Sequence, residues 1–314
     1  MKLGVVILAA GQGTRMRSAL PKVLHPLAGQ PLLAHVLAAA RQLGAERTCV
    51  VYGHGGESVP SALAGAACTW VEQAERLGTA HAVIQGMPAM EGMDRVLVLY
   101  GDVPLIRPET LSRLVADAAD QPLGLLTMHL ADPTGYGRIV RDHDGRMLRI
   151  VEHKDATAAE LGIQEVNTGI IIADRARLGD WLGRVGNANA QGEYYLTDVV
   201  GLAVAEGAMV ASTQPEFPEE VAGVNDRVQL AQLERWHQAR EAERLMRAGV
   251  TLLDPARFDL RGRLEVGQDV TIDINCVFEG LVRLGDRVRI GPNCCLRDCT
   301  IGPATQVLAN CVID

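Results

Sequence analysis

The sequence has no apolar run that approaches the roughly 20 residues of a membrane-spanning helix. It also has no excess of basic residues, because 30 Lys and Arg stand against 38 Asp and Glu, for a formal net charge of −8. That balance argues against nucleic acid as a partner, while leaving room for a local basic pocket. The chain enters an apolar segment at Leu3 without a signal peptide. We therefore expect a cytoplasmic protein with neither a membrane nor a nucleic-acid partner.

Lysine is scarce, since only Lys2, Lys22 and Lys154 occur among the 30 basic residues. A lysine inside a polar motif of this chain therefore points to a chemical role. Seven cysteines are present, and because nothing points to secretion we interpret them as reduced thiols. The length of 314 residues exceeds one ordinary core, so we expect two domains.

The N-terminal apolar run, residues 5–9, ends in a loop that contains Gly11, Gly13, Arg15 and Lys22. A buried parallel strand is a continuous hydrophobic run, and ligands bind at the carboxyl ends of such strands. Glycines allow backbone N–H groups to approach an anionic oxygen, and Arg15 and Lys22 supply positive charge. A Gly-x-Gly alone is more often a tight turn, but together with these cations it predicts a phosphate-binding loop.

The spacing in this loop separates it from the two commonest phosphate loops. Met16 stands where a dinucleotide-binding fingerprint has its third glycine, and the Gly-Lys-Ser/Thr ending of a P-loop is missing. Pro21 instead fixes the approach of the chain to Lys22. The loop therefore indicates phosphate binding of another kind.

Strand-like and helical patterns alternate over residues 1–227, which predicts βαβ units and a mostly parallel, doubly wound α/β sheet. Strands are expected at residues 3–9, 48–52, 96–100, 124–130, 148–153 and 166–173. Helices are expected at residues 31–43, 79–86, 109–119 and 196–205. Residues 226–248 form one long helical pattern with few apolar positions, typical of a connecting arm. We expect domains at 1–227 and 249–314, joined by a linker helix at 228–248.

After Gly262 the apolar residues recur every six positions in two registers, which start at Leu264 and Val266. The register slips by one residue and resumes at Ile301. A sustained hexapeptide period is typical of a parallel β-helix, in which small and branched side chains stack inside successive coils. Four cysteines fall on interior positions and are interpreted as small apolar fillers rather than metal ligands: Cys276, Cys294, Cys299 and Cys311.

The repeat reaches Asp314 without a polar capping segment. Repeat arrays need such caps, and an open parallel edge invites association. We therefore expect either a partner that covers this end or a longer protein of which this chain is the front part.

A second polar cluster, Tyr100-Gly101-Asp102, directly follows an apolar strand. A carboxylate at the carboxyl end of a parallel strand, beside a phosphate loop, suits Mg²⁺, which binds few protein oxygens and keeps waters and substrate phosphates. The alternative is that Asp102 caps a turn before Pro104. Asn225 is a candidate second ligand, and its alternative role is the N-cap of the long helix.

Several further segments carry polar groups that are weak signals one by one. Gln73 is suited to present its amide to a base edge, with Gly78 and Thr79 close to it. Four other loops supply donors and acceptors suited to sugar hydroxyls and an acetamido group: those around Gly137, Glu152, Asn167 and Thr197. Each alone is better explained as ordinary loop chemistry.

Together these segments resemble the bacterial bifunctional N-acetylglucosamine-1-phosphate uridyltransferase / glucosamine-1-phosphate acetyltransferase family, over essentially the whole chain. The first of the matching motifs is shared with many sugar nucleotidyltransferases, and the later ones are more specific. They are Leu8-Ala9-Ala10-Gly11-x-Gly13-Thr14-Arg15-Met16, Pro21-Lys22-Val23-Leu24, Gln73, Leu77-Gly78-Thr79, Tyr100-Gly101-Asp102, Gly135-Tyr136-Gly137-Arg138, Ile150-Val151-Glu152-His153-Lys154-Asp155, Asn167-Thr168-Gly169 and Gly192-Glu193-Tyr194-Tyr195.

The resemblance implies a Rossmann-like nucleotidyltransferase domain with a mostly parallel sheet, then a long helix and the first coils of a left-handed parallel β-helix. It implies Mg²⁺-dependent, in-line attack by N-acetylglucosamine 1-phosphate on the α-phosphorus of UTP. The products would be pyrophosphate and UDP-N-acetylglucosamine, a precursor of peptidoglycan and lipopolysaccharide in the cell wall.

The resemblance also implies residue roles. The uridine nucleotide would be held by Leu8, Ala9, Ala10, Gly11, Gln73, Gly78 and Thr79, with Tyr100 and Gly101 beside it. The N-acetylglucosamine moiety would be held by Gly137, Glu152, Asn167 and Thr197. Asp102 and Asn225 would coordinate Mg²⁺. Arg15 would face the leaving pyrophosphate, and Lys22 would neutralise phosphate charge.

The C-terminal part departs from the family pattern, whose acetyl transfer uses a histidine and an acetyl-CoA groove in later coils. The present sequence has no histidine after His237 and no lysine after Lys154. We expect acetyl-CoA to be a substrate only of a full-length form, and this chain to lack acetyltransferase activity. Family members assemble through the β-helix, so a homotrimer is also expected.

Two rival functions remain open from the sequence. One is another sugar-1-phosphate nucleotidyltransferase that uses dTTP or ATP; Gln73, residues 152–154 and the hexapeptide repeat count against it. The other is a non-catalytic assembly subunit with the same fold. Such a subunit is expected to lose phosphate or metal groups, whereas this chain retains Arg15, Lys22, Asp102 and Asn225.

Overall fold

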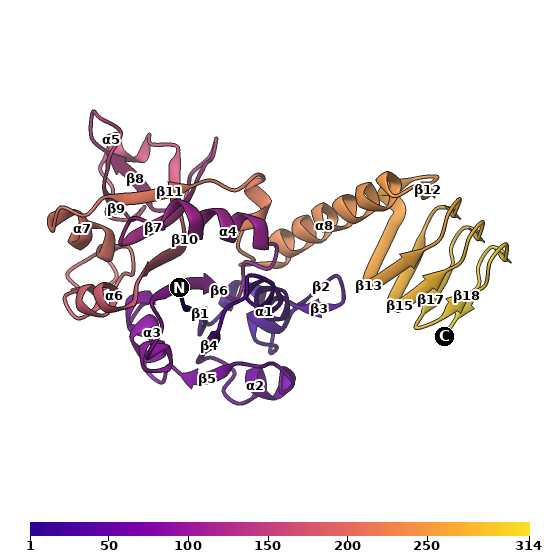
Figure 1. The fold of residues 1–314 in the computed structure, drawn as a ribbon, viewed down its shortest axis with the longest axis horizontal. Coiled ribbons are helices and arrows are strands. Elements are labelled where there is room, and N and C mark those ends of the chain that lie inside the picture. The colour runs from indigo at the N-terminus through magenta and orange to yellow at the C-terminus, as the bar shows by residue number, and fades with distance from the viewer. The chain divides into compact units, whose positions relative to one another are not determined.

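The structure, a computed structural model, describes residues 1–314 and divides into two compact units (Figure 1). Unit 1 comprises residues 1–24 and 32–225, and unit 2 comprises residues 25–31 and 226–314. The domain limits expected from the sequence, 1–227 and 249–314 with a linker helix at 228–248, remain a prediction. Every helix is either too short or too polar to cross a lipid bilayer.

Unit 1 is built on a mixed, mostly parallel sheet with strand order β11-β7-β10-β6-β1-β4-β5. These strands are β1 (Leu3–Ala9), β4 (Arg47–Tyr52), β5 (Thr69–Glu72), β6 (Arg95–Tyr100), β7 (Leu123–His129), β10 (Glu165–Asp174) and β11 (Val210–Thr213). β1 pairs in parallel with both β4 and β6, so their carboxyl ends share one edge of the sheet. β10 runs antiparallel to β6 and β7, whereas the alternating pattern alone predicts no reversed strand.

Helices bury both faces of this sheet, which explains the continuous apolar run of β1. Val5 and Ile7 pack on one face, in a core with α1 (Leu32–Gln42) and α4 (Pro108–Asp117). Val6 and Leu8 pack on the other face. That second core includes α3 (Thr79–Gly86), α6 (Arg175–Leu182) and α7 (Asp198–Ala205). All of the β1 residues are buried, as expected for a central parallel strand.

Several smaller elements complete unit 1. β8 (Arg138–Arg141) and β9 (Met147–Val151) form an antiparallel pair, and β8 also pairs with β10. The remaining elements are α2 (Ser58–Ala62), α5 (Ala158–Leu161), and the 3-10 turns Thr14–Met16, Lys22–Leu24, Met87–Met90 and Pro218–Val221.

Most expected elements are present, with shifts of a few residues at their ends, and the helix at residues 79–86 matches α3. The expected strand at 148–153 is β9, which belongs to a hairpin rather than to a βαβ unit. The helix expected from residue 196 begins only at Asp198. α6, β8 and β11 were not expected because their sequences are short or polar.

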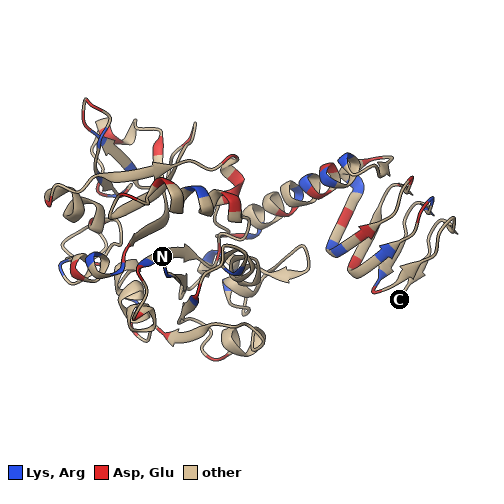
Figure 2. Cartoon of the chain, viewed as in Figure 1, with Lys and Arg blue, Asp and Glu red and all other residues tan.

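The larger segment of unit 2 starts with the long helix α8 (Arg227–Arg247). Asp226 caps it, since the carboxylate Oδ1 accepts a hydrogen bond of 2.8 Å from the backbone N–H of Gln229. The helix surface carries alternating basic and acidic residues (Figure 2), with ion pairs such as Arg247–Glu243. The short hairpin β2 (Pro26–Leu27) and β3 (Gln30–Pro31) belongs to the same unit, and Ala28 N–H donates to Glu234 at 2.7 Å.

The remaining residues of unit 2 form the first coils of a parallel β-helix. Phe258 pairs with Cys276, 18 residues later, whereas Cys295 pairs with Val312, 17 residues later. This confirms the one-residue slip. The strands are β12 (Thr251–Leu252), β13 (Phe258–Val266), β14 (Thr271–Ile272), β15 (Cys276–Leu284), β16 (Arg289–Ile290), β17 (Cys295–Arg297), β18 (Thr300–Ile301), β19 (Gln306–Val307) and β20 (Val312–Ile313), and a 3-10 turn covers Pro255–Arg257.

The interior of the coils is filled as the hexapeptide pattern predicts. Cys276 and Cys294 are buried in the core, and Cys299 and Cys311 pack against it. On the outside, Glu279 forms ion pairs with Arg261 and Arg297 of the adjacent coils. The side chains of Asn275, Asn293 and Asn310 form a hydrogen-bonded ladder at left-handed backbone positions. Asparagine tolerates such positions better than most residues.

Candidate active site

The loop after β1 forms one wall of a cavity of about 550 Å³ in unit 1. A Cβ at Gly11 would meet no atom within 4 Å, so the backbone is open to an approaching group. Gly13 has a φ of 60°, and a Cβ there would lie 2.6 Å from the Cβ of Lys22. Glycine therefore allows the loop to fold back onto Lys22.

Lys22 meets two oxygen-bearing side chains from other parts of unit 1. Its ammonium forms an ion pair with the carboxylate of Asp102, which follows β6, and lies 3.5 Å from Oδ1 of Asn225. The backbone brings these groups together, because the N–H of Val224 donates to the carbonyl of Asp102 at 2.8 Å. The alternative role of Asn225 as a helix cap is wrong, since Asp226 caps α8.

The opposite wall of the cavity is the segment between β5 and α3. Gln73 is 4% exposed, and its Nε2 donates to the carbonyl of Gly78 at 3.2 Å and contacts Nδ1 of His81 at 3.0 Å. Gly78 has a φ of 115°, and a Cβ there would lie 2.5 Å from the carbonyl oxygen of Tyr194. The hydroxyl of Thr79 accepts a hydrogen bond of 2.9 Å from Leu196 N–H. Only glycine fits at position 78, because the backbones of residues 78 and 194 approach so closely.

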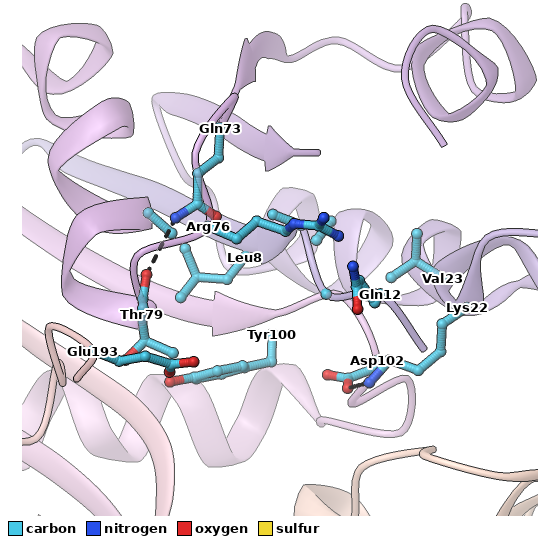
Figure 3. A pocket seen from close by; sticks show the side chains of 15 residues that line it. Leu8, Gln12, Lys22, Val23, Gln73, Arg76, Thr79, Tyr100, Asp102 and Glu193 are labelled. Carbon is cyan, nitrogen blue, oxygen red and sulfur yellow. Dashed lines mark hydrogen bonds and ion pairs between the residues drawn. The ribbon is translucent and has the colours of Figure 1, made fainter. Parts of the chain in front are cut away.

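Figure 3 shows the cavity with these groups around it. It is lined by Leu8, Ala9, Ala10, Gly11, Gln12, Lys22, Val23, Gln73, Arg76, Gly78, Thr79, Ala82, Tyr100, Asp102 and Glu193. Most of the residues assigned to the nucleotide therefore come together in one place. Gly101 is buried behind the cavity, where a Cβ would meet Ala9 and Leu33.

Arg15, like Gly101 and Asn225, does not line the cavity, and it is the one of the three with no contact to a lining residue described above. Its side chain is exposed in the turn Thr14–Met16 and is not among the lining residues. The turn is flanked by Gly13 and Arg17, which both have left-handed backbone conformations. The expected contact of Arg15 with pyrophosphate therefore stays a prediction.

The residues expected to bind the sugar lie close to one another and to the nucleotide cavity. The Thr197 hydroxyl donates to Oε1 of Glu152 at 3.0 Å, and the N–H of Asn167 donates to the carbonyl of Gly137 at 2.9 Å. Tyr100 lines both the nucleotide cavity and a small internal cavity with Asn167 and Thr197. The tyrosine ring thus lies between the two groups of residues.

Glu152 and Thr197 also line a second cavity, of about 590 Å³, together with Asp155 and Asp198. Burial raises the pKa of Glu152 above its usual range, and the nearby carboxylates of Asp155 and Asp198 add to this effect. The hydrogen bond from Thr197 acts in the opposite direction because it stabilises the carboxylate. The carboxylate is therefore a hydrogen-bond acceptor that already receives one neutral hydroxyl donor, that of Thr197.

Five lining residues are not among the predicted nucleotide-binding groups, and three of the five carry polar side chains: Gln12, Arg76 and Glu193. Gln12 occupies the variable position of Gly-x-Gly, and Arg76 lies in a turn where an arginine is commonplace. Glu193 belongs to a distant segment, and the sequence does not reveal that its neighbour Tyr194 contacts the Gly78 turn. The only sequence signal that these three side chains reach the cavity is their position inside or next to the recognised motifs.

Two comparisons with known proteins identify the family to which the chain belongs. The family profile of the MobA-like NTP transferase domain matches residues 5–252. The bifunctional protein GlmU of Azoarcus sp. (strain BH72) is 61% identical over 303 residues, which cover 96% of this chain and 67% of the relative. GlmU of Pseudomonas entomophila (strain L48) is 58% identical over 314 residues, all of this chain and 69% of the relative.

Solved structures share the fold at low identity. A UDP-glucose pyrophosphorylase complexed with UDP-glucose has a TM-score of 0.63 at 17% identity, covering 76% of this chain and all of the other. A nucleotidyl transferase from Methanothermobacter thermautotroptrophicus has a TM-score of 0.55 at 20% identity, covering 79% and 99%. On the identity and coverage of its relatives, the chain belongs to the GlmU family and carries that family's nucleotidyltransferase domain.

Proposed function

We propose that the chain transfers the uridylyl group of UTP to N-acetylglucosamine 1-phosphate, forming UDP-N-acetylglucosamine and pyrophosphate. The chain carries the uridyltransferase part of the GlmU family, and one feature of its geometry supports the reaction most strongly. The cavity at the carboxyl ends of β1 and β6 combines a glycine loop, the Lys22–Asp102 pair and the Gln73–Gly78 wall. The sugar-binding candidates begin on the far side of Tyr100.

The chemistry is a displacement at the α-phosphorus of UTP. A phosphate oxygen of the sugar phosphate forms a bond to this phosphorus, and the bond to the bridging oxygen of the β-phosphate breaks. Pyrophosphate leaves with the electron pair, so no proton has to be removed by a general base. Such a reaction depends mainly on alignment and on neutralising charge. Lys22 supplies that charge from within the cavity, and we propose that Arg15 faces the departing pyrophosphate.

The residues around Lys22 fit a magnesium ion. Asp102 and Asn225 present a carboxylate and an amide oxygen to one point, where the Lys22 ammonium lies between them. The two oxygens therefore already surround a positive charge. Mg²⁺ needs only one or two protein oxygens besides water and phosphate. When bound, the ion would offset the negative charge of the reacting phosphates. We propose Asp102 and Asn225 as its ligands.

The sugar would be read by groups that are already in place. Glu152 would accept a hydrogen bond from a sugar hydroxyl, while Thr197 and Asn167 would contact the hydroxyl and acetamido groups. A side chain at position 137 would lie 2.9 Å from Ile150 and 3.4 Å from the Glu152 carboxylate, so glycine keeps this space open. These roles rest on the spatial grouping of the residues and on the family resemblance.

We further propose that the enzyme acts in the cytoplasm as a homotrimer formed through the β-helix. All seven cysteines are free, and burial raises the pKa values of Cys49, Cys68 and Cys276 to about 11. Such thiols stay protonated and unreactive at neutral pH, as suits a reducing compartment. Support for assembly comes from Leu253 and Leu308, which are 57% and 66% exposed on the coils.

Pyrophosphate release tests the proposed function. UTP with N-acetylglucosamine 1-phosphate and Mg²⁺ should give rapid release, and removal of Mg²⁺ by chelation should stop it. Equal or faster release with dTTP, ATP or CTP would favour a different nucleotidyltransferase. No release with any of these nucleotides would favour a non-catalytic assembly subunit.

A further inference from the structure

Two side chains that belong to no predicted binding group approach each other across the nucleotide cavity (Figure 3). Gln12 lies on the phosphate loop, between Gly11 and Gly13. Arg76 extends from the opposite wall, on the turn between β5 and α3. The pair thus connects the loop expected to hold phosphates with the wall expected to hold the base.

The contact between them is short and two-pronged. With the amide oxygen of Gln12 turned towards Arg76, it accepts hydrogen bonds of 2.7 and 2.8 Å from the two terminal guanidinium nitrogens. The partner is neutral, so this contact leaves the positive charge of Arg76 uncompensated. Lys22, the other cation that lines the cavity, is paired with the Asp102 carboxylate. Arg76 therefore has a charge available for an anionic ligand.

The position of the guanidinium selects which part of a nucleotide it can meet. Because it reaches the side chain of Gln12, it lies next to the glycine loop rather than beside Gln73. The backbone at Gly11 is open to an approaching group, with no atom within 4 Å of a Cβ built there. Guanidinium groups bind phosphate oxygens in a bidentate manner and more strongly than they bind a neutral amide. An incoming phosphate can therefore displace the Gln12 amide.

We propose that Arg76 binds the phosphate chain of UTP, and that Gln12 holds the guanidinium in place while the cavity is empty. This inference rests on the proposed function, since it requires a nucleoside triphosphate in the cavity. It adds a phosphate-binding group from outside the glycine loop. It also assigns Gln12 a positioning role, because its amide orders a long, exposed side chain that would otherwise sample many rotamers.

The test compares Arg76→Gln with Arg76→Lys and with Arg41→Gln, a control that removes an exposed arginine from the last turn of α1. We expect Arg76→Gln to raise the KM for UTP about tenfold, with the KM for N-acetylglucosamine 1-phosphate unchanged. Arg76→Lys keeps the positive charge but loses the two parallel N–H donors of the guanidinium, so its KM for UTP should be intermediate. Arg41→Gln should match the wild type, and all three should unfold at the wild-type temperature.

Binding measurements separate a phosphate contact from a base contact. For Arg76→Gln, the preference for UTP over UMP should fall about tenfold, while the affinity for uridine should not change. An unchanged KM for UTP, or an equal loss of affinity for uridine, would overturn the proposal. Failure of the proposed function would look different, because the wild type itself would then release no pyrophosphate from UTP.

Discussion

The single residue on which the account depends most is Asp102. Its carboxylate pairs with Lys22, and its backbone carbonyl accepts the N–H of Val224, so it fixes both the cation and the position of Asn225. The side chain is 19% exposed, which places the pair at the floor of the cavity rather than in bulk water. Removing one partner of a partly buried ion pair lowers the stability of the fold more than removing one partner of an exposed pair.

We expect Asp102→Ala to lower kcat by about 100-fold or more, because it removes the proposed metal ligand and disturbs Lys22. Pyrophosphate release over a series of Mg²⁺ concentrations measures the effect, and circular dichroism checks that the fold is intact. Asp120→Ala, which changes an exposed carboxylate, is the matched control. Unchanged turnover in Asp102→Ala would place the metal site elsewhere.

Glu152 offers a test that separates substrate binding from stability. Because its pKa is raised in the folded protein, protonation favours folding, and the ionised carboxylate destabilises the fold. This cost is absent at pH values below the pKa that Glu152 has in the unfolded chain. It is fully present once the pH exceeds the pKa that Glu152 has in the folded protein. Glu152→Gln should therefore raise the unfolding temperature at neutral pH, with the gain vanishing as the pH falls through the acid range.

The same substitution should raise the KM for N-acetylglucosamine 1-phosphate about tenfold and leave the KM for UTP unchanged. Initial rates at varied concentrations of each substrate, and thermal unfolding from acid to neutral pH, provide the two readouts. A rise in the KM for UTP alone would move Glu152 from the sugar site to the nucleotide site. A loss of stability at neutral pH would contradict the stated effect of burial.

At the scale of elements, the turn between β5 and α3 shapes the nucleotide cavity. Tyr194 N–H donates to the carbonyl of Leu77 at 2.8 Å, and Ala80 N–H donates to the carbonyl of Tyr194 at 2.9 Å. Gly78 lies between these two bonds, in a conformation that L-residues rarely adopt. The turn is therefore fixed to a segment more than a hundred residues away, by its backbone as well as by Thr79.

We expect Gly78→Ala to push this turn away from Tyr194 and to raise the KM for UTP about tenfold or more. The strained backbone should also cost about 1–3 kcal/mol, or about 2–4 °C of unfolding temperature per kcal/mol. Steady-state kinetics and thermal unfolding measure both effects. Gly65→Ala is the control, because a Cβ there meets no neighbour and its φ is not positive. Equal behaviour of the two variants would show that the close approach is unimportant.

The sequence predicts elements better than it predicts their pairing. Continuous apolar runs identify β1 and β6, and the hexapeptide period identifies the coils, because these patterns reflect burial directly. The antiparallel direction of β10 leaves no trace in its own residues. In the same way, Arg76 and Glu193 reach the cavity only because of how distant segments pack. Motif residues such as Lys22 and Asp102 could be grouped because both follow strands that share one edge of a parallel sheet.

At the scale of the whole molecule, the sequence divides the chain at residue 227, but contacts divide it differently. Residues 25–31 group with α8 and the coils, through bonds such as Ala28 to Glu234. No local pattern could reveal this, since a short hairpin near the N-terminus looks like part of the first domain.

The proposed trimer gives a prediction at the same scale. We expect a mass of three times 33.6 kDa by analytical ultracentrifugation. Leu308→Glu places a charge on an exposed apolar position of the coils and should lower this mass. Glu91→Lys, an exposed charge change in unit 1, should leave it unaltered. A monomeric wild type at micromolar concentration would contradict assembly through these coils.

The central claim is uridylyl transfer from UTP, and the fate of a labelled phosphate tests it most directly. In reactions with N-acetylglucosamine 1-phosphate and Mg²⁺, label in the α-phosphate of UTP should appear in UDP-N-acetylglucosamine. Label in the γ-phosphate should appear only in pyrophosphate. Release of γ-labelled inorganic phosphate, or no transfer of the α-label to the sugar, would contradict the account.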